Sequence, residues 1–485
     1  MNERYSLDTP IEPEMVLSAA NFREVCPEVL SPLAFSLIGA GMEIAFRDIA
    51  RKTGWHVDGP SPRFVSYQAF RPFHVMSSLE KVIHAVPLIS RGDVWEYLLG
   101  GPPPTVATRY ITPTMTEKAA TAIRLAWLIQ ENDRAATQAM AAVARAEHRA
   151  VAAIANKSNI QAGSALEELR TAGRLAWALH TRTTTAAVAC TSVLRRVYRR
   201  EFGNQAADEI IRLAAKRAND AAAASASVGR LTQQSHRLQN YEVADRSRRF
   251  RRFTMASAAA QGEIFLSSSP TTRLPETTLL ERVGSSLTSM LDRLLAERER
   301  SKELGLRALH GVRCLLDAEL GDFDASDAAL LGVDELLTGT ITELQRLIAV
   351  RSEELDGASK LQIDPDLGER DGRLISLERP AATLEGSQLG TPLATGFARG
   401  VLANELGSRH GMDTIIVGER VDGNYVLAVR PAGVITTFGS VLSHVAIVCR
   451  ELRIPLVTSI RVPSHLLGRI GSVDGWSGLV TAEDQ

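Results

Sequence analysis

The sequence has few cysteines, few aromatic residues and almost no net charge. Its four cysteines (Cys26, Cys190, Cys314 and Cys449) are far apart and form no CxxC or Cys/His cluster. Neither a disulfide framework nor a zinc site is therefore expected, and a reducing compartment fits. Lys and Arg total 55 and Asp and Glu total 56, giving a net charge of −1. This balance does not favour nucleic acid or an acidic membrane surface as the main partner.

Long hydrophobic runs are also absent. No window approaches roughly 18 uninterrupted apolar residues, because even the Ala-rich stretches carry Arg or Glu every few positions. The N-terminus, MNERYSLDTPIEPEM, is acidic and has no apolar core, so it is not a signal peptide. We expect a cytoplasmic protein that does not enter membranes. Its 485 residues are too many for one hydrophobic core, which predicts more than one domain.

The residue pattern predicts a large helical domain. Residues 21–112 mix short helical runs with Pro and Gly, and residues 113–356 are strongly helical in pattern. The expected helical runs cover 116–158, 164–200, 206–233, 277–305 and 329–354. Their Ala and Leu stripes are best explained by core packing. We therefore predict an N-terminal tail at 1–20 and a mostly helical domain at 21–356, built as a bundle of long antiparallel helices.

A linker and a smaller domain are expected after the helical runs. The stretch 356–392 is rich in Gly, Pro and acidic residues and has weak periodicity. Short β-type segments follow at 413–421, 424–430, 433–438, 455–460 and 478–483. The predicted fold is a multidomain α and α/β chain, with a linker at 357–385 and a small C-terminal α/β domain at 386–485. A flexible linker favours relative movement of the two domains.

One histidine follows a serine at the head of an apolar helix, in GSVLSHVAIVCRELRIPLV. Ser443 is predicted to be the N-cap, which places His444 at the first helical position. Free backbone N–H groups and the positive end of the helix dipole there favour an anion, such as a phosphoryl group on the imidazole. Gly439 and Ser440 allow a second backbone to approach. A buried structural histidine is the alternative, and no His or Cys stands at the spacing of a metal site.

This segment resembles the phosphohistidine swivelling-domain signature of phosphoenolpyruvate-utilising enzymes. The matching residues are Gly439, Ser443, His444, Ala446, Ile447, Arg450, Glu451, Ile454, Pro455 and Val457. Ser440 replaces the second glycine of that signature, and Cys449 replaces the small residue before its arginine. GTPLATGFARG (390–400) and GSVDGWSGLV (471–480) resemble the opening strand and the closing segment of the same domain. The resemblance implies that His444 is transiently phosphorylated and carries the phosphoryl group between two distant sites.

Within these enzymes the chain resembles the rifampicin phosphotransferase-like family, which orders an ATP-grasp domain, a helical drug-binding domain and a swivelling domain. NFREVCPEVLSPLAFSLIG (21–39) resembles the entry into that helical domain. SHRLQNYEVADRSRRF (235–250) resembles its Gly-His-Arg segment through His236, Arg237, Glu242 and Arg249, and departs from it at Ser235, Leu238 and Arg248. The resemblance thus covers nearly the whole chain.

The resemblance also implies a partner protein. Only about thirty residues stand before the SPL motif, where an ATP-grasp domain would need roughly 200–300, and no Gly-rich phosphate loop occurs elsewhere. We expect a separate ATP-grasp protein that binds ATP and Mg²⁺, with no cofactor on this chain. No phosphoenolpyruvate-binding barrel is expected after Gln485. The arrangement resembles the split phenylphosphate synthase.

The implied mechanism assigns roles to particular residues. His444 takes a phosphoryl group from ATP, Arg450 and the helix N-terminus hold its oxygens, and Ser443 orients the ring or caps the helix. The acceptor is a hydroxyl or enol of a small molecule in the helical domain, with His236 as general base. The residues expected to bind the acceptor are Arg237, Glu242, Arg249, Tyr67 and Arg71. For each of these residues a structural role is the alternative reading.

Two other functions remain open at this point. A pure phosphocarrier would pass phosphate from one protein to another, although it would not need a large acceptor domain. A non-catalytic homologue would bind a ligand or act as the scaffold of a complex, although Ser443, His444 and Arg450 are retained.

Overall fold

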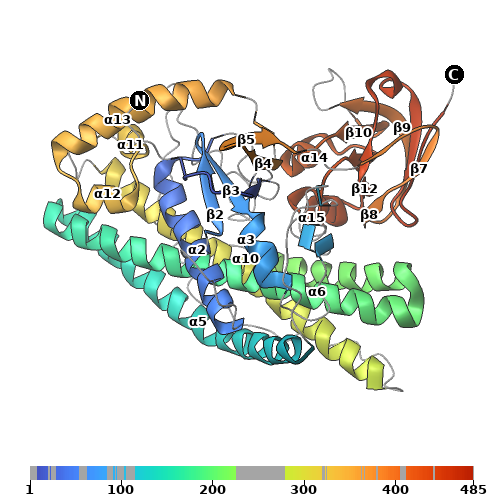
Figure 1. The fold of residues 1–485 in the computed structure, drawn as a ribbon, viewed down its shortest axis with the longest axis horizontal. Helices are drawn as coiled ribbons and strands as arrows, with labels where there is room; N and C mark the ends of the chain where they lie inside the picture. The colour runs from blue at the N-terminus through green and yellow to red at the C-terminus, as the bar shows by residue number, and fades with distance from the viewer. Residues whose placement is uncertain are drawn as a thin grey trace.

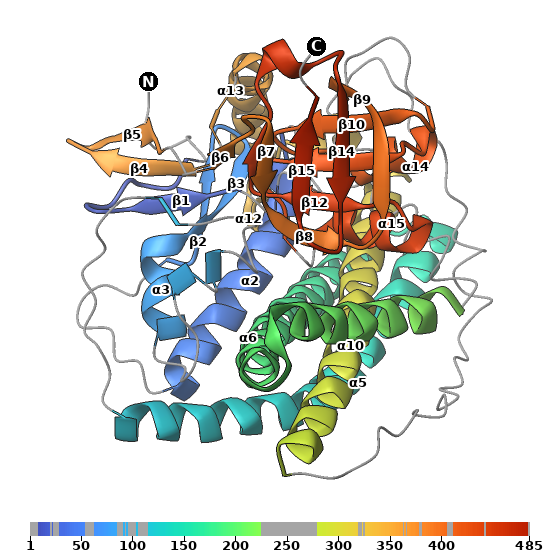
Figure 2. The same cartoon turned by 90° about the vertical axis from the view of Figure 1, so that its right-hand side faces the viewer.

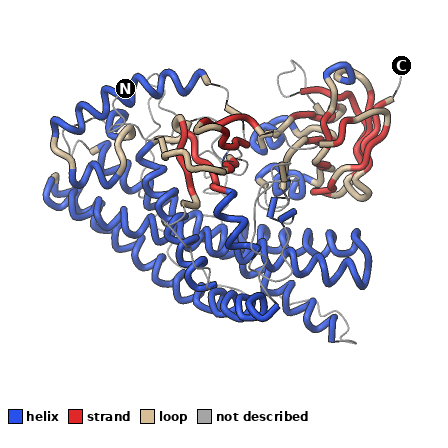
Figure 3. Tube along the Cα trace, viewed as in Figure 1, coloured by secondary structure: helices blue, strands red, loops and turns tan. Residues whose placement is uncertain are grey.

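The protein is described here by a computed structural model. The described residues are 8–19, 22, 29–53, 63–84, 91–92, 94–95, 103–104, 115–224, 279–318, 323, 325–361, 363–364, 366–377, 381–404, 411–440 and 443–483. Figure 1 shows a large helical body with a small sheet packed beside it, and a strand-rich domain near the C-terminus. We call residues 8–377 the body and residues 381–483 the C-terminal domain. Figure 3 shows how helices dominate the first part and strands the second.

Helices supply most of the body, as the sequence predicts. They are α2 (Pro32–Thr53), α3 (Met76–His84), α5 (Met115–Asn156), α6 (Asn159–Ala224), α10 (Leu279–Asp317), α11 (Ala325–Ala328), α12 (Val333–Thr338) and α13 (Ile341–Lys360). The body's largest core joins α2 to α5, α6 and α10, through buried side chains such as Leu33, Trp177 and Leu309. The predicted helical character of this region is confirmed.

The long helices α5, α6 and α10 lie side by side (Figure 1). Asp133 pairs with Arg293, and Glu147 accepts a 2.8 Å hydrogen bond from Nε of Arg307. These two pairs advance together along α5 and α10, so the two helices run parallel. His180 of α6 contacts the carbonyl oxygen of Arg298, and Cys190 of α6 donates to that of Leu287, so α6 is antiparallel to α10. The bundle is therefore not antiparallel throughout.

A single helix, α6, replaces two predicted helical runs. The sequence predicts separate runs at 164–200 and 206–233, but α6 continues from Asn159 to Ala224. Gly203 lies inside it. A glycine in a helix interior costs about 1 kcal/mol relative to alanine, which strong helix formers on both sides can offset. The predicted break between the runs 164–200 and 206–233 is therefore wrong, because one glycine does not interrupt this helix.

A five-stranded sheet packs beside the helices, in the order β2-β3-β1-β4-β5. Its strands are β1 (Val16–Ser18), β2 (Val65–Gln68), β3 (Arg71–Val75), β4 (Asp366–Arg370) and β5 (Arg373–Ser376). The central strand β1 comes from the stretch expected to be a tail, and β4 and β5 come from the stretch expected to be a linker. Pairing between segments about 350 residues apart leaves no local signal in the sequence. Leu17 pairs with Leu367 and Val75, and all three side chains are buried.

The C-terminal domain contains an eight-stranded sheet in the order β7-β15-β14-β9-β10-β11-β12-β8. Its strands are β7 (Ser387–Leu389), β8 (Thr391–Ala394), β9 (Phe397–Asn404), β10 (Thr414–Gly418), β11 (Gly433–Thr436), β12 (Leu456–Thr458), β14 (Ile470–Asp474) and β15 (Leu479–Ala482). Strands β9 to β12 are parallel. Separately, β6 (Ala382–Thr383) pairs with β13 (Ile460–Arg461), close to the short 3₁₀ helix η2 (Ser464–Leu466). Figure 2 shows β7, β15, β14 and β9 side by side.

One predicted strand of this domain is a helix. The apolar run at 424–430 is expected to be a strand, but α14 (Gly423–Val429) is helical. Because β10 and β11 are parallel neighbours, the chain needs a crossover between them, and a helix on one face of the sheet supplies it. Val426 of α14 packs with Val445 and Val448 of α15 (His444–Leu452). A short apolar run could not distinguish a buried helix from a buried strand.

The helix α15 faces the body. It contacts α6, and both Figure 1 and Figure 2 place it on the side of the C-terminal domain nearest to α6. The segment expected to carry a phosphoryl group therefore lies next to the longest helix of the body. No helix within the described residues is long and apolar enough to span a bilayer.

Candidate functional site

Ser443 caps α15, as the sequence predicts. Its φ and ψ are −67° and 150°, and its Oγ accepts a hydrogen bond of 3.2 Å from the backbone N–H of Ala446. Its side chain is 1% exposed. The helix begins at His444, so the histidine occupies the first helical position. Backbone N–H groups of the first turn have no partner within a helix, and this end of the helix dipole attracts an anion.

The turn that leads to His444 continues from the carboxyl end of β11. The backbone N–H of Thr437 donates to the carbonyl oxygen of Gly418 at 3.1 Å, and that of Phe438 donates to Glu419 at 2.9 Å. These bonds extend the pairing of β10 and β11 beyond the strands. The turn is therefore fixed to the edge where parallel strands end, which is the edge where ligands bind in open α/β sheets.

Three buried hydroxyl groups lie around this turn without a hydrogen-bond partner among the described residues. They are Oγ1 of Thr436, Oγ of Ser440 and Oγ1 of Thr458, on residues that are at most 2% exposed. A buried hydroxyl without a partner costs about 1–3 kcal/mol. Thr436 ends β11 and Thr458 ends β12, next to each other in the sheet. Among the described residues, these three hydroxyls are thus unsatisfied donors beside the turn that carries His444.

Gly439 keeps space open between two of these hydroxyls. A β-carbon at Gly439 would lie 3.3 Å from Oγ1 of Thr436 and 3.4 Å from Oγ1 of Thr458. The first separation is tighter than ordinary contact and the second is at its lower limit, so a side chain here would displace Thr436 or the turn. Gly439 and Ser440 thus lie where the sequence places them, in the turn before α15. Thr436 and Thr458 were missed, although each is a threonine at the end of an apolar strand.

Arg450 lies at the opposite end of α15 from His444. Six residues separate them, which is about 9 Å along a helix axis. Arg450 is 8% exposed, and its Nη1 donates to the carbonyl oxygen of Leu393 in β8 at 3.3 Å. The guanidinium therefore links the last turn of α15 to the sheet, where a cation also complements the helix dipole. This placement does not support the expected contact between Arg450 and a phosphoryl group at His444.

The buried face of α15 holds the helix in place. Val445, Ala446, Val448 and Cys449 are at most 5% exposed and belong to the core that α15 shares with α14 and the sheet. Burial raises the pKa of the Cys449 thiol to about 12. Cys449 therefore stays a neutral thiol at ordinary pH and packs as a small apolar residue.

Tyr67 and Arg71 lie in the interior of the body. Tyr67 is 1% exposed, stacks on Phe35 with ring centroids 4.2 Å apart, and donates its hydroxyl hydrogen to the carbonyl oxygen of Leu30. Arg71 donates to the carbonyl oxygens of Ala69 and Leu361 at 3.1 and 2.9 Å. Both residues thus join the small sheet to the helices, and this geometry does not support the expected contact with an acceptor.

The remaining predicted residues of the acceptor site cannot be placed. His236, Arg237, Glu242 and Arg249 lie outside the described residues. Their roles as base and acceptor-binding residues stay predictions. Within the described ranges, no three His, Cys, Asp or Glu side chains gather as metal ligands.

The comparison with family models identifies the C-terminal domain. No curated protein matches the chain. Residues 412–478 match the family described as PEP-utilising enzyme, mobile domain. The match covers β10 to the turn after β14 and includes Ser443, His444 and the three buried hydroxyls. It implies a domain that carries a phosphoryl group on a histidine, as in phosphotransferases and dikinase-like enzymes. The segment 412–478 is therefore a mobile domain of the PEP-utilising enzyme family.

Proposed function

We propose that this chain is the phosphoryl-carrying component of an ATP-dependent phosphotransferase, with His444 as the carrier. The observation that carries the proposal is the position of His444, at the start of a capped helix in a mobile domain of the PEP-utilising family. The free N–H groups of the first turn and the helix dipole favour a phosphoryl group there. The hydroxyls of Thr436, Ser440 and Thr458, which have no partner among the described residues, add hydrogen-bond donors beside the turn.

The proposed loading step uses an ATP-grasp protein as a separate partner, with ATP and Mg²⁺ bound there. A nitrogen of the neutral imidazole attacks a phosphorus atom of ATP. A P–N bond forms, the P–O bond to the leaving nucleotide breaks, and the phosphoryl group moves to His444. Support for this partner comes from the resemblance to enzymes that combine ATP-grasp, helical and swivelling domains. The covalent intermediate divides one difficult transfer into two easier ones.

The proposed unloading step takes place at the body. An acceptor hydroxyl or enol oxygen attacks the phosphorus atom, the P–N bond breaks, and the acceptor proton passes to a general base, for which His236 is the candidate. The contact between α15 and α6 supports this direction of transfer, because it brings the carrier helix to the helical body. It favours a small-molecule acceptor on the body over a protein-to-protein carrier or a binding subunit.

The test is phosphoryl labelling of His444. The full chain is incubated with the ATP-grasp partner and ATP labelled at the β or the γ position, and acid-labile label is mapped by mass spectrometry. The wild type and the control H465A, which removes an exposed histidine of η2, should both be labelled at His444. H444A should carry no label. If wild type and H444A stay equally unlabelled with the partner present, the proposal is wrong.

A further inference from the structure

Six large apolar side chains are exposed on one face of the C-terminal domain. β7, β15, β14 and β9 are neighbours in the sheet, and burial alternates along each of them. Their inward residues, such as Val473 and Val480, belong to the core of the domain. The outward apolar residues define what we call the outer face, and they are Leu389, Phe397, Val401, Ile470, Leu479 and, in the turn after β14, Trp476. Single exposed apolar residues are ordinary on a protein surface, but a group on adjacent strands marks an interaction site.

Strand register brings four of these side chains to one end of the outer face. Leu479 pairs with Leu389, and Phe397 pairs with Asp474, the residue from which the turn to β15 starts. Trp476 lies in that turn. Leu389 and Phe397 are 64% and 66% exposed, and Trp476 is 57% exposed. Large aromatic side chains are the residues that contribute most to protein interfaces, so this end of the face is suited to a protein partner.

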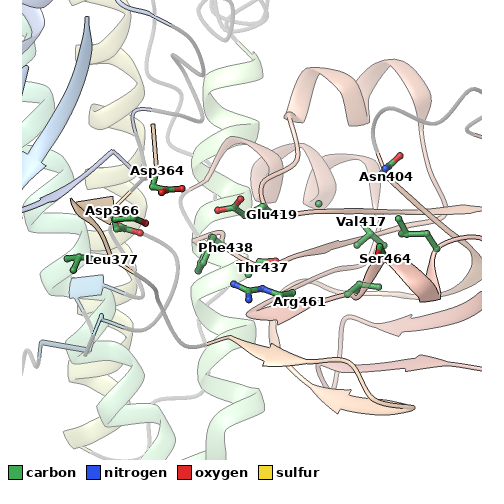
Figure 4. A pocket seen from close by; sticks show the side chains of 14 residues that line it. Asp364, Asp366, Leu377, Asn404, Val417, Glu419, Thr437, Phe438, Arg461 and Ser464 are labelled. Carbon is green, nitrogen blue, oxygen red and sulfur yellow. The ribbon is translucent and has the colours of Figure 1, made fainter. Parts of the chain in front are cut away.

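The outer face points away from the body. In Figure 1 β7 and β9 lie near the right-hand edge of the molecule, and Figure 2, which views that side, shows the four strands in front. The body meets the C-terminal domain elsewhere, where Asp366 of β4 and Phe438 line one pocket (Figure 4) and α15 contacts α6. No element of the described chain therefore covers the outer face.

The size of the outer face fits a stable dimer. Val401, which pairs with Ile470, forms a second apolar group on the same face. The exposed fractions of all six apolar side chains correspond to roughly 600 Å², the upper end for the largest apolar patch of a typical monomer. Between the two apolar groups, Arg399 and Glu483 are 57% and 48% exposed. With these polar side chains the face offers roughly 800 Å², which is what one partner buries in an interface of standard size.

The charges of the outer face suit a contact with a copy of itself. Arg399 and Glu483 have opposite signs and are joined by two hydrogen bonds of 2.8 Å. The third charged residue on this face, Asp474, accepts hydrogen bonds of 2.9 Å from the N–H of Trp476 and 2.7 Å from the hydroxyl of Ser477, in its own turn. Paired charges do not repel their copy, and Arg399 of one copy can meet Glu483 of the other across a two-fold axis. Nucleic acid or an anionic membrane would need an excess of positive charge, which these four strands do not carry.

We propose that the outer face binds the outer face of a second copy of this chain and forms a dimer with two-fold symmetry. Burial of the six apolar side chains supplies the driving force, and the charge pair between the two apolar groups fixes the register of the two sheets.

This dimer goes beyond phosphoryl transfer and does not rest on it. In the dimer α15 stays on the side of α6, so the carrier helix can still meet the body. The variant H444A should form the dimer as the wild type does, so a failure of phosphoryl labelling leaves the dimer intact.

The mass of the full chain in solution tests the dimer. Interfaces of standard size give dissociation constants of about 1 µM or tighter. Sedimentation velocity at about 100 µM should therefore show a species of twice the chain mass, and a dilution series gives its dissociation constant. A wild type that stays monomeric at this concentration would overturn the proposal.

Matched variants locate the contact. F397E places a carboxylate on the outer face of both copies, where a buried charge without a partner opposes association. Its dimer dissociation constant should rise at least about tenfold. The control I160E introduces the same charge at Ile160, which is 90% exposed in the first turn of α6, and should dimerise as the wild type does. A dimer that F397E leaves unchanged would use another surface, and the assigned face would be wrong.

A variant without added charge separates apolar burial from repulsion. W476A removes the aromatic side chain of the turn after β14, and its dimer dissociation constant should also rise at least about tenfold. Circular dichroism of F397E and W476A should match that of the wild type, because Phe397 and Trp476 are mostly exposed in the single chain. An effect of F397E without any effect of W476A would contradict an apolar contact between the two sheets.

Discussion

Thr436 and Thr458, at the carboxyl ends of neighbouring parallel strands, both direct their hydroxyl oxygens toward the position that a β-carbon of Gly439 would occupy, at 3.3 and 3.4 Å. Neither hydroxyl has a partner among the described residues. A structure that served stability alone would satisfy such groups or replace them by methyl groups. The presence of these two buried hydroxyls is explained if they form hydrogen bonds with a polar group while the site functions.

Replacing either threonine by valine should separate stability from function. T458V removes a buried hydroxyl that has no partner in the described part of the chain and keeps the shape, so the free energy of unfolding should rise by about 1 kcal/mol. Labelling of His444 should fall about tenfold, because a donor beside the carrier turn is lost; a tenfold effect corresponds to about 1.4 kcal/mol. Urea unfolding and labelling with the partner measure the two effects. T183V is the control, since Oγ1 of Thr183 is already bonded to Leu179 at 2.7 Å, and it should not stabilise or change labelling.

A methyl group on Gly439 should impair loading of His444. In G439A the new β-carbon lies 3.3 Å from Oγ1 of Thr436, which is tighter than ordinary contact, and 3.4 Å from Oγ1 of Thr458, so the turn or Thr436 must shift by a few tenths of an ångström. Labelling should fall about tenfold, which corresponds to about 1.4 kcal/mol. The control G357A places its methyl group in open space on α13 and should label normally, with helix stability increased by about 1 kcal/mol. Normal labelling of G439A would show that the space at Gly439 has no role.

Loss of the Ser443 cap should cost both stability and phosphorylation. S443A removes the acceptor of the Ala446 N–H and should lower the free energy of unfolding by about 1 kcal/mol. Thr340 caps α13 by the same type of bond, at a 3.4 Å distance from the N–H of Glu343, far from His444 in the sequence. T340A should cost a similar stability and leave labelling unchanged. If both variants reduce labelling equally, the effect of S443A is only a loss of stability.

Acid should weaken the body through His74. This side chain is 3% exposed, stacks on Phe22 with ring centroids 4.7 Å apart, and burial lowers its pKa from 6.5 to about 4. On acidification the histidine of the unfolded chain takes up a proton first. The contribution of His74 to the free energy of unfolding is therefore complete above pH 6.5 and is lost as the pH falls toward 4. Between pH 7 and pH 5 the loss amounts to about 2 kcal/mol.

The variant H74L tests this dependence. Its free energy of unfolding, measured in urea, should change less between pH 7 and pH 5 than that of the wild type, by about 2 kcal/mol. The exposed His465 provides the control H465L, which should follow the wild type. Parallel pH profiles for H74L and the wild type would exclude His74 as the source.

Local patterns made some of this structure predictable and left the rest hidden. The helical runs, the Ser443 cap and the segment around His444 were readable, because each depends on residues a few positions apart. The strand β1 could not be predicted from a local pattern, since it is defined by pairing with β4, which is far away in the sequence. Helix geometry gives the separation of Arg450 and His444 along the axis of α15. The direction of the Arg450 side chain could not be predicted, because it is fixed by a hydrogen bond to Leu393 in another element. The contact of α15 with α6 joins two domains, and no local pattern specifies it.

The last prediction concerns Arg351, whose side chain connects α13 to α12. It is 2% exposed and donates to both carboxylate oxygens of Glu335, at 2.6 and 2.7 Å, and to the carbonyl oxygen of Leu330 at 2.9 Å. Burial alone would raise the pKa of Glu335, but the hydrogen bonds and charge of Arg351 hold it below its usual value. R351L leaves the partly buried carboxylate of Glu335 without its cationic partner and should destabilise by about 3–5 kcal/mol.

Arg399 supplies the matched control for this variant. It also binds a carboxylate through two bonds of 2.8 Å, to Glu483, but its side chain is 57% exposed. R399L should therefore cost less than about 1 kcal/mol, because water and salt screen an exposed pair. Urea unfolding of both variants measures the contrast, and similar losses in the two would show that burial does not determine the strength of these bidentate pairs. In R351L the pKa of Glu335 should rise. As the pH is lowered below the usual carboxylate range, the free energy of unfolding of R351L should therefore fall less than that of the wild type.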